Sequence, residues 1–232
     1  MEIFCRLLFG HLLADFTFQT NFIADWKRRK KLGLLAHVAI HPVCYLLLTR
    51  PFLLDTWTHF LNIPLNGLSC IAIATALHYV EDWFRVNKIN EGWNDNTLFF
   101  VWDQAVHILI LLFLSPWRDQ TLQNSWPLLG SLFVVVTHFA TVSIWFVEKD
   151  IYGREYPETE EKYISILQRL VVWLAFFLPH PWWLFVLAFV LISFGRHVWT
   201  RRIDFSWTSV VMGNALAVIC GLVARFSIGY HF

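Results

Sequence analysis

Long apolar runs dominate this sequence, and they restrict the chain to a fold whose helices cross a lipid bilayer. A spanning helix needs about 20 mostly apolar residues. Segments of this kind occupy residues 3–25, 32–49, 66–84, 97–114, 126–147, 163–178, 181–198 and 207–225. We therefore predict an all-α, polytopic integral membrane bundle of about eight transmembrane helices. Pro42 is expected to kink or break the second of them.

The composition agrees with a membrane protein and excludes two other classes. Charged residues make up only 15% of the chain, hydrophobic residues make up 57%, and the mean hydropathy is +0.51. A soluble domain carries roughly 25% charged residues. The formal net charge of +1 gives no electrostatic support for binding nucleic acid. The lipid bilayer is the expected partner, and the oligomeric state is left open.

The basic residues predict how the helices are oriented. Lysine and arginine accumulate on the cytosolic side of membrane proteins. On one side of the predicted spans lie Lys27, Arg28, Arg29, Lys30, Lys31, Arg85, Lys88, Lys149, Arg154, Lys162, Arg196, Arg201 and Arg202. The other side has only Arg50, Arg118 and Arg225. We predict that the first side faces the cytosol and that both termini lie outside it.

Ionisable residues inside the first four apolar segments occur in pairs four residues apart. Such residues are expensive within a membrane helix and are usually functional, and residues four apart share one helix face. The pairs are His11 with Asp15, His37 with His41, His78 with Asp82, and Asp103 with His107. Two side chains placed in this way can hold one metal ion from a single helix.

Chance does not explain these pairs. Random placement of the histidines and aspartates predicts roughly 1.5 pairs at this spacing, and the chain has five. The fifth pair, Asp55 with His59, lies in a loop predicted to be external, so one pair alone would carry little weight. Four pairs in four consecutive helices indicate that they contribute to one shared site.

The predicted depths of these residues agree as well. Counted from the cytosolic ends at about 1.5 Å per residue, Asp15, His41 and His107 lie roughly 14–15 Å deep. On the same count at about 1.5 Å per residue, His37 and Asp103 lie roughly 8–9 Å deep, together with His78 and Gln19. His11 lies deeper and Asp82 lies shallower. The spacing within each pair did not force this agreement, which predicts one polar centre in the cytosolic half of the bilayer.

The ligand types suggest which metals the centre would bind. Five histidines and three aspartates suit zinc, iron or manganese better than a soft metal. Eight donors are too many for one ion and suit two divalent ions, as in bundles whose facing helices supply carboxylates and histidines. Two ions about 3.5–4 Å apart can activate water and stabilise a hydrolytic transition state. Hydrogen bonding between helices and a proton or ion pathway are the alternatives.

Four more polar residues could assist the centre. Gln19 and Gln104 extend the ligand faces and could orient ligands or join helices. Arg169, in the sixth segment, could neutralise a buried aspartate or snorkel to the cytosol, or it could bind an anionic substrate group such as phosphate. A lone His138 in the fifth segment is more often a hydrogen-bonded packing residue than a ligand.

These motifs resemble a bacterial membrane family of unknown function, the DUF3307-type proteins. The matching stretches are GHLLADFTFQT at 10–20, HVAIH at 37–41, HYVEDW at 78–83 and WDQAVH at 102–107. The family's motif residues fall on His11, Asp15, Gln19, His37, His41, His78, Asp82, Asp103, Gln104 and His107. In the second half, YISILQRLV at 163–171 is similar to a family segment that usually has glutamate where Gln168 stands. The resemblance implies a protein of the bacterial inner membrane that depends on metal, and it brings no established activity.

We therefore predict a metal-binding membrane domain over residues 1–120 and a second membrane region over 121–232. The expected function is dinuclear, metal-dependent hydrolysis of an amphipathic or lipid-like substrate from the cytosolic side, with Asp82 as a candidate base. A di-iron oxidase or oxygenase is the second enzyme class. A metal or proton transporter and a purely structural metal site are the alternatives without catalysis.

Overall fold

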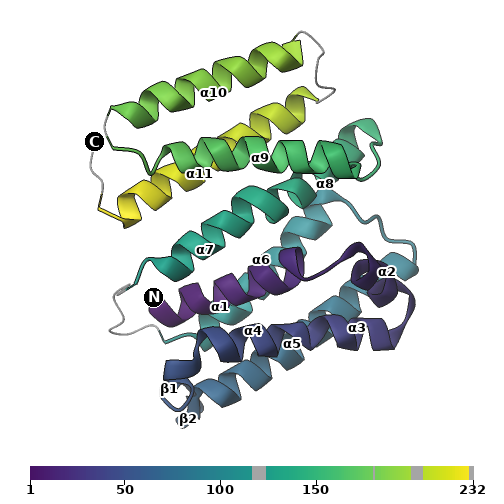
Figure 1. Cartoon of the computed structure of the whole chain (residues 1–232). Helices are drawn as coiled ribbons and strands as arrows, with labels where there is room; N and C mark the ends of the chain where they lie inside the picture. The colour runs from purple at the N-terminus through teal and green to yellow at the C-terminus, as the bar shows by residue number, and fades with distance from the viewer. Residues whose placement is uncertain (117–123, 180, 200–205, 230–232) are drawn as a thin grey trace. The chain divides into compact units, whose positions relative to one another are not determined.

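The chain folds almost entirely into helices, which form two compact units over residues 1–131 and 132–232 (Figure 1). The computed structural model describes residues 1–116, 124–179, 181–199 and 206–229. The domain division predicted at residue 120 lies outside these ranges, as do Arg118, Arg201 and Arg202 of the orientation argument. Each unit is described by itself below.

The first unit is built on a ring of packed helices. Helix α1 (Glu2–Leu12) packs against α4 (Ile40–Leu48) and α6 (Thr97–Leu114). Helix α5 (Gly67–Asn90) closes the ring because it packs against α4 and α6 as well. Helix α3 (Lys31–Val38) continues into α4 and also packs against α5. The ring therefore encloses one interior that all four predicted pairs can reach.

The first apolar segment is shorter than predicted. Instead of one helix over 3–25, α1 runs into a π-helical turn, η1 (Leu13–Thr17), and a separate helix, α2 (Asn21–Arg29), follows. The hydroxyl of Thr20 accepts a hydrogen bond from the backbone N–H of Ile23, which begins α2 as an N-cap. The predicted span extends past this cap because Phe22 and Ile23 continue the apolar pattern.

The break expected from Pro42 is present at Ala39, between α3 and α4. Proline lacks an N–H, and its ring collides with the carbonyl four residues earlier, here that of Val38. The helix therefore ends at Val38 and starts again at Ile40.

A short hairpin closes one end of the first unit. A 3₁₀ turn, η2 (Arg50–Phe52), leads into strands β1 (Thr56–Phe60) and β2 (Ile63–Asn66), which pair antiparallel. Trp57 turns inward and joins an apolar core of Ile3, Leu7, Tyr45, Cys70, Ile71, Ala74 and Leu111. This core fills the end of the bundle where α1 and α5 begin and α6 ends.

The second unit contains the remaining helices. Helix α7 (Trp126–Val134) begins in the first unit and leads through a π-helical turn, η3 (Val135–Phe139), into α8 (Ala140–Tyr152). Helices α9 (Thr159–Ala175), α10 (Trp182–Trp199) and α11 (Trp207–Ser227) follow. Helix α9 lies at the middle of the unit, packed against η3, α8, α10 and α11.

Four helical stretches of the described chain are long and apolar enough to cross a membrane. They are Lys31–Leu48, Thr97–Leu114, Trp126–Tyr152 and Trp207–Ser227, and a shorter apolar helix covers Trp182–Arg196. The all-helical class is therefore confirmed, whereas the count of eight spans stays a prediction.

Candidate metal centre

The four predicted pairs converge in the half of the first unit opposite its apolar core. Along α1 the core residues Ile3 and Leu7 are followed by His11, and along α5 Ile71 is followed by His78. Helix α6 runs the opposite way, so its core residue comes after its polar pair. The nearest imidazole rings, those of His41 and His78, have centroids only 3.8 Å apart.

The local backbone favours this convergence at two points. Asp15 lies in the π-helical turn η1, a distortion that is frequent at functional sites because it redirects side chains. His37 and His41 lie on either side of the break at Ala39, yet their ring centroids are 5.1 Å apart. The pair His11 with Asp15 and the pair His37 with His41 therefore each direct two donors to the interior, although neither pair lies on one regular helix.

Asp15 is the hub of a first group of donors. Its Oδ1 atom lies 3.0 Å from Nε2 of His41, 3.2 Å from Nε2 of His37 and 3.8 Å from Nε2 of His78. Its Oδ2 atom lies 3.6 Å from Nε2 of His11. All five side chains are buried. Asp15, His37, His41 and His78 each offer an atom within 4.8 Å of those of the others, which is the arrangement of a four-ligand metal site.

A second group of donors joins α5 and α6. It consists of Glu81, Asp82, Asp103 and His107, whose donor atoms also lie within 4.8 Å of one another. Glu81 was not predicted. Its Oε2 atom lies 3.0 Å from Nε2 of His107, and its side chain is buried. The search for pairs four apart missed it because Glu81 is three residues from His78, a spacing that also places two side chains on one helix face.

The two groups of four share no residue, and other contacts connect them. Asp82 Oδ2 of the second group lies 3.2 Å from Nε2 of His37 and 3.6 Å from Nε2 of His78 in the first. His11 of α1 forms a third set of neighbouring donors with Asp15 and His107. The cluster is therefore one continuous polar centre, and it has enough donors to bind two ions.

Many of these buried donor atoms lack a protein hydrogen bond. Among the described residues, no hydrogen-bond partner is found for Nε2 of His37, His78 and His107, nor for either carboxylate oxygen of Glu81. Buried polar atoms are normally satisfied. Donor atoms that lie within 4.8 Å of one another and have no hydrogen-bond partner are available as ligands of a shared ion. The donor set therefore fits a metal.

The two groups differ in chemical character. Three histidines and one aspartate form the first group, a set that suits zinc or iron. Three carboxylates and one histidine form the second, which favours a harder ion such as manganese or iron. Buried His, Asp and Glu groups that could hold a metal are thus present, and the identity and number of ions belong to the proposal below.

The predicted auxiliary glutamines have different positions. Gln104 is buried and donates from Nε2 to Oδ2 of Asp103, at 2.9 Å, and to Oδ2 of Asp15, at 3.4 Å, so it ties the two groups together. Gln19 lies beyond η1 in the loop before α2, so it does not continue the helical stripe of His11 and Asp15 as expected. Among the described residues, no hydrogen bond or ion pair connects Gln19 to the donor groups.

Arg169 and His138 belong to the second unit, where their contacts are explained by that unit alone. The buried Arg169 guanidinium donates from Nε to the carbonyl of Val136 at 2.8 Å, and from one terminal nitrogen to the carbonyl of Thr137 at 3.1 Å. Both carbonyls lie in η3, where a π-helical turn disturbs the regular backbone bonds. His138 contacts the hydroxyl of Thr137 through Nδ1 at 3.1 Å.

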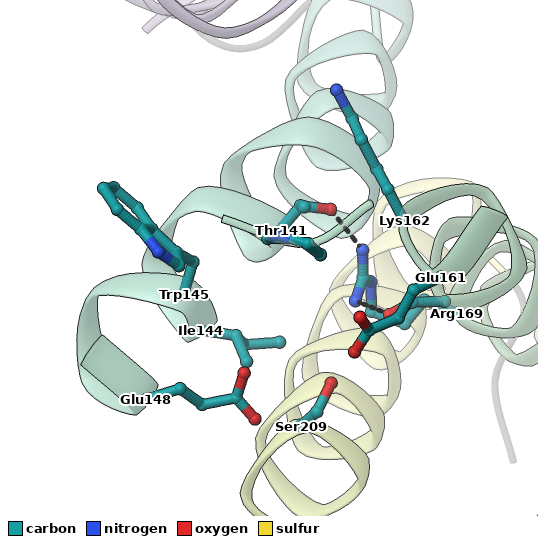
Figure 2. A pocket seen from close by; sticks show the side chains of 10 residues that line it. Thr141, Ile144, Trp145, Glu148, Glu161, Lys162, Arg169 and Ser209 are labelled. Carbon is teal, nitrogen blue, oxygen red and sulfur yellow. Dashed lines mark hydrogen bonds between the residues drawn. The ribbon is translucent and has the colours of Figure 1, made fainter. Parts of the chain in front are cut away.

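A small pocket with a cavity volume of about 20 Å³ lies beside Arg169 (Figure 2). The guanidinium also donates to the hydroxyl of Thr141 at 2.6 Å, as a dashed line in Figure 2 indicates. It donates to the hydroxyl of Ser165 at 2.6 Å as well. Glu148 and Lys162 also line the pocket. Since protein acceptors already bind the guanidinium on several sides, its contacts indicate that it stabilises η3.

Comparison with known proteins assigns the chain to a family. The family described as Protein of unknown function (DUF3307) matches residues 3–139, which include every donor of both groups. The chain belongs to this family. A search of curated proteins and a search of solved structures each found no match.

Proposed function

We propose that this protein is a membrane-embedded, dinuclear metal-dependent hydrolase that acts on an amphipathic or lipid-like substrate from the cytosolic side. The observation that carries the proposal is the pair of four-residue donor groups that share no residue and lie together in one buried centre. A single structural ion would need only one such group. Two adjacent groups are typical of hydrolytic centres.

The surface of the first unit supports its location in a bilayer. Helix α6 buries Asp103 and His107 in the bundle and exposes Leu98, Val101 and Phe113, with 76%, 54% and 66% of each residue accessible. A soluble helix would place these residues the other way round. In a bilayer, lipid covers the apolar side chains, and buried ionisable groups face the bundle interior. The basic end of α2 would then lie at the cytosolic interface, as in a bacterial inner-membrane protein.

In the proposed hydrolysis, the residues of the centre have different roles. Asp15, His37, His41 and His78 would hold one ion, and Glu81, Asp82, Asp103 and His107 would hold the other. Bound divalent ions would supply Lewis acidity and a nucleophilic water at neutral pH. The buried imidazoles exclude bulk water, and Gln104 fixes the orientation of Asp103 and Asp15.

Asp82 is a poorer candidate for the general base than its sequence position suggests. The Nζ atom of Lys27 lies 3.4 Å from both carboxylate oxygens of Asp82, and a cation at that distance disfavours proton uptake. Asp82 and Glu81 both belong to the second donor group, so the proposal uses them as ligands and assigns neither as the base.

A di-iron oxidase or oxygenase is the second candidate, and the composition of the second group favours it. Glu81, Asp82 and Asp103 beside His107 form a carboxylate-rich set of the kind that helical bundles use for di-iron centres. Iron content and an iron-dependent absorbance band would separate this candidate from a zinc or manganese hydrolase.

Transport through the centre has less support. A pathway across the membrane needs polar groups that continue to the opposite side. Beyond the donor groups, Ile3, Leu7, Ile71, Ala74 and Leu111 form a packed apolar core. This core favours a site that opens on one side only.

Elemental analysis of the purified full chain tests the proposal. Wild type is expected to hold about two equivalents of metal, as a dinuclear centre requires. Asp15→Ala is expected to lose both, and His41→Ala, whose residue belongs only to the first group, to lose at least one. The exposed Asp55 and His59 of the hairpin provide a matched control, because they have the same spacing outside the bundle. His59→Ala should retain the metal. A metal-free wild type would leave interhelical hydrogen bonding as the role of the cluster.

A further inference from the structure

Helix α2 is set apart from the helices that enclose the metal centre. None of its residues is buried, and it packs on α3. Between the two helices Lys30 has an extended backbone, so α2 does not continue the axis of α3 (Figure 1). The stretch Lys31–Leu48, which is long and apolar enough to cross a membrane, begins two residues after α2 ends. With that stretch across the bilayer, α2 lies at the bilayer surface.

The inward and outward faces of α2 carry different side chains. Lys27 reaches inward, and its Nζ atom lies 3.4 Å from Oδ2 of Asp82. Phe22, which is 72% exposed, lies five residues earlier and therefore on the opposite face. Arg29 lies seven residues after Phe22, which is close to two turns, so it shares the outward face. The outward face thus combines an aromatic ring with a cation.

Exposed apolar side chains continue this surface beyond both ends of α2. Phe18 before the helix is 47% exposed, and Leu32 after it is 67% exposed. The ring of Phe22 contacts that of Trp26 in the same helix, with centroids 5.8 Å apart. Exposed apolar side chains beside cations are typical of helices that lie in the headgroup region of a bilayer.

Three cations of this surface have no counter-ion within the described part of the chain. Arg29, Lys30 and Lys31 are exposed, and none of them forms an ion pair there. Their basic neighbours in α2, Lys27 and Arg28, are already paired with aspartates. The segment 18–32 has a single acidic residue, so three unpaired cations and one carboxylate leave an excess of two positive charges. A positive and partly apolar surface is complementary to anionic phospholipid headgroups.

The position of the surface favours lipid over a soluble acidic partner. Leu32 belongs to the apolar stretch Lys31–Leu48, so the exposed apolar side chains continue the surface that lipid would cover along that stretch. Long basic side chains near the end of a membrane helix extend to the interface, which keeps these cations within reach of headgroup phosphates.

We propose that residues 18–32, which are α2 and its flanks, form an interfacial element that binds anionic phospholipids of the cytosolic leaflet. The apolar side chains enter the boundary between headgroups and acyl chains, and the three cations bind the phosphates. Because Lys27 connects the same helix to Asp82, the bound lipid lies beside the second donor group. The inference rests on the membrane location and orientation proposed above, and on neither the metals nor hydrolysis.

Lipid binding to the detergent-purified full chain tests the proposal. Titration with fluorescent phosphatidylglycerol and phosphatidylcholine in mixed micelles should show a preference of about tenfold or more for the anionic lipid, because each cation near an anionic surface contributes about fivefold. A variant with Arg29→Gln, Lys30→Gln and Lys31→Gln should lose that preference. The matched control conserves each charge, with Arg29→Lys, Lys30→Arg and Lys31→Arg, and should stay within about twofold of wild type. All three side chains are exposed, so both variants should keep the wild-type helical content.

A spin label attached at Phe22→Cys, with the full chain in bilayer nanodiscs, tests where α2 lies. The four native cysteines are buried, so the introduced thiol is the one that reacts. The label should be protected from a water-soluble nickel chelate. A label at Asn94→Cys, in the exposed loop after α5, is the control and should be accessible to the chelate.

The outcomes separate this inference from the proposed function. Equal binding of the two lipids by wild type, or an unchanged preference in the glutamine variant, would overturn it. A label at position 22 as accessible as the one at position 94 would also overturn it and leave this face to a soluble acidic partner. His41→Ala should keep the preference for phosphatidylglycerol, because His41 lies in the buried centre and not on this surface. A metal-free protein that keeps the preference would support this inference and overturn the metal-dependent function alone.

Discussion

Replacing Asp15 with asparagine should disable both halves of the centre while leaving the bundle folded. The substitution conserves the shape of the side chain and removes its charge. Asp15 belongs to the first donor group and to the set that His11 and His107 form, and Gln104 connects it to Asp103. We therefore expect Asp15→Asn to lose both metal equivalents. Asp103→Asn, whose residue belongs only to the second group, should lose one.

The magnitude follows from binding linkage. Loss of an outer partner of a metal ligand typically weakens affinity 10–100-fold, and loss of a ligand should do at least as much. At a free metal concentration about 100 times the dissociation constant, one ion stabilises the fold by about 2.7 kcal/mol. A 100-fold weaker site would retain only about 0.4 kcal/mol of that stabilisation. Without metal, the asparagine keeps an acceptor for His41, so the difference should be about 1 kcal/mol.

Thermal unfolding in detergent, with metal and with a chelator, measures both quantities. Wild type should unfold at a clearly higher temperature with metal, and Asp15→Asn should show nearly the same transition in both conditions. An equal metal-dependent shift in the two proteins would refute the assignment of Asp15 as a ligand. A chelated variant far less stable than chelated wild type would instead indicate that the aspartate acts mainly as a hydrogen-bond acceptor.

Three further results are expected. Metal affinity, measured by competition with a chelating dye, should fall as the pH is lowered, because protons compete with the metal for the imidazole nitrogens and carboxylates; an affinity that does not depend on pH would exclude these ligands. Gly33→Ala should destabilise the packing of α2 on α3 by about 1–3 kcal/mol in denaturant titrations, because an added β-carbon would overlap the backbone carbonyl of Trp26. Arg169→Met should lower the unfolding temperature, because it leaves the η3 carbonyls of Val136 and Thr137 without a donor. Its metal content should equal that of wild type, and loss of metal would assign Arg169 a role in the centre.

Local rules explain which parts of the fold could be predicted from the sequence. Helix α6 begins at Thr97 and ends at Leu114, as predicted, because an asparagine N-cap precedes an uninterrupted apolar run. The break at Ala39 followed from Pro42 for the same kind of reason. The prediction for the first segment was wrong beyond Thr17, because a π-helical turn and an N-cap end the helix inside an apolar pattern. Neither the cap nor the π-helical turn can be predicted from hydrophobicity alone.

The candidate site was predictable to the extent that it depends on helix periodicity. Residues four apart had to share a face, so four pairs could be named without knowing how the helices pack. Glu81 could not be found in that way, because its place beside His107 depends on how α5 meets α6. Likewise, Lys27 was counted only as a cytosolic charge, because the turn that folds α2 back over Asp82 is a tertiary feature.

The central claim is that two ions occupy two separate donor groups in one centre. Anomalous diffraction from crystals of the metal-loaded protein, recorded on both sides of the absorption edge of the bound metal, tests it most directly. We expect two peaks, one among Asp15, His37, His41 and His78 and one among Glu81, Asp82, Asp103 and His107. A single peak, or none within these groups, would contradict it.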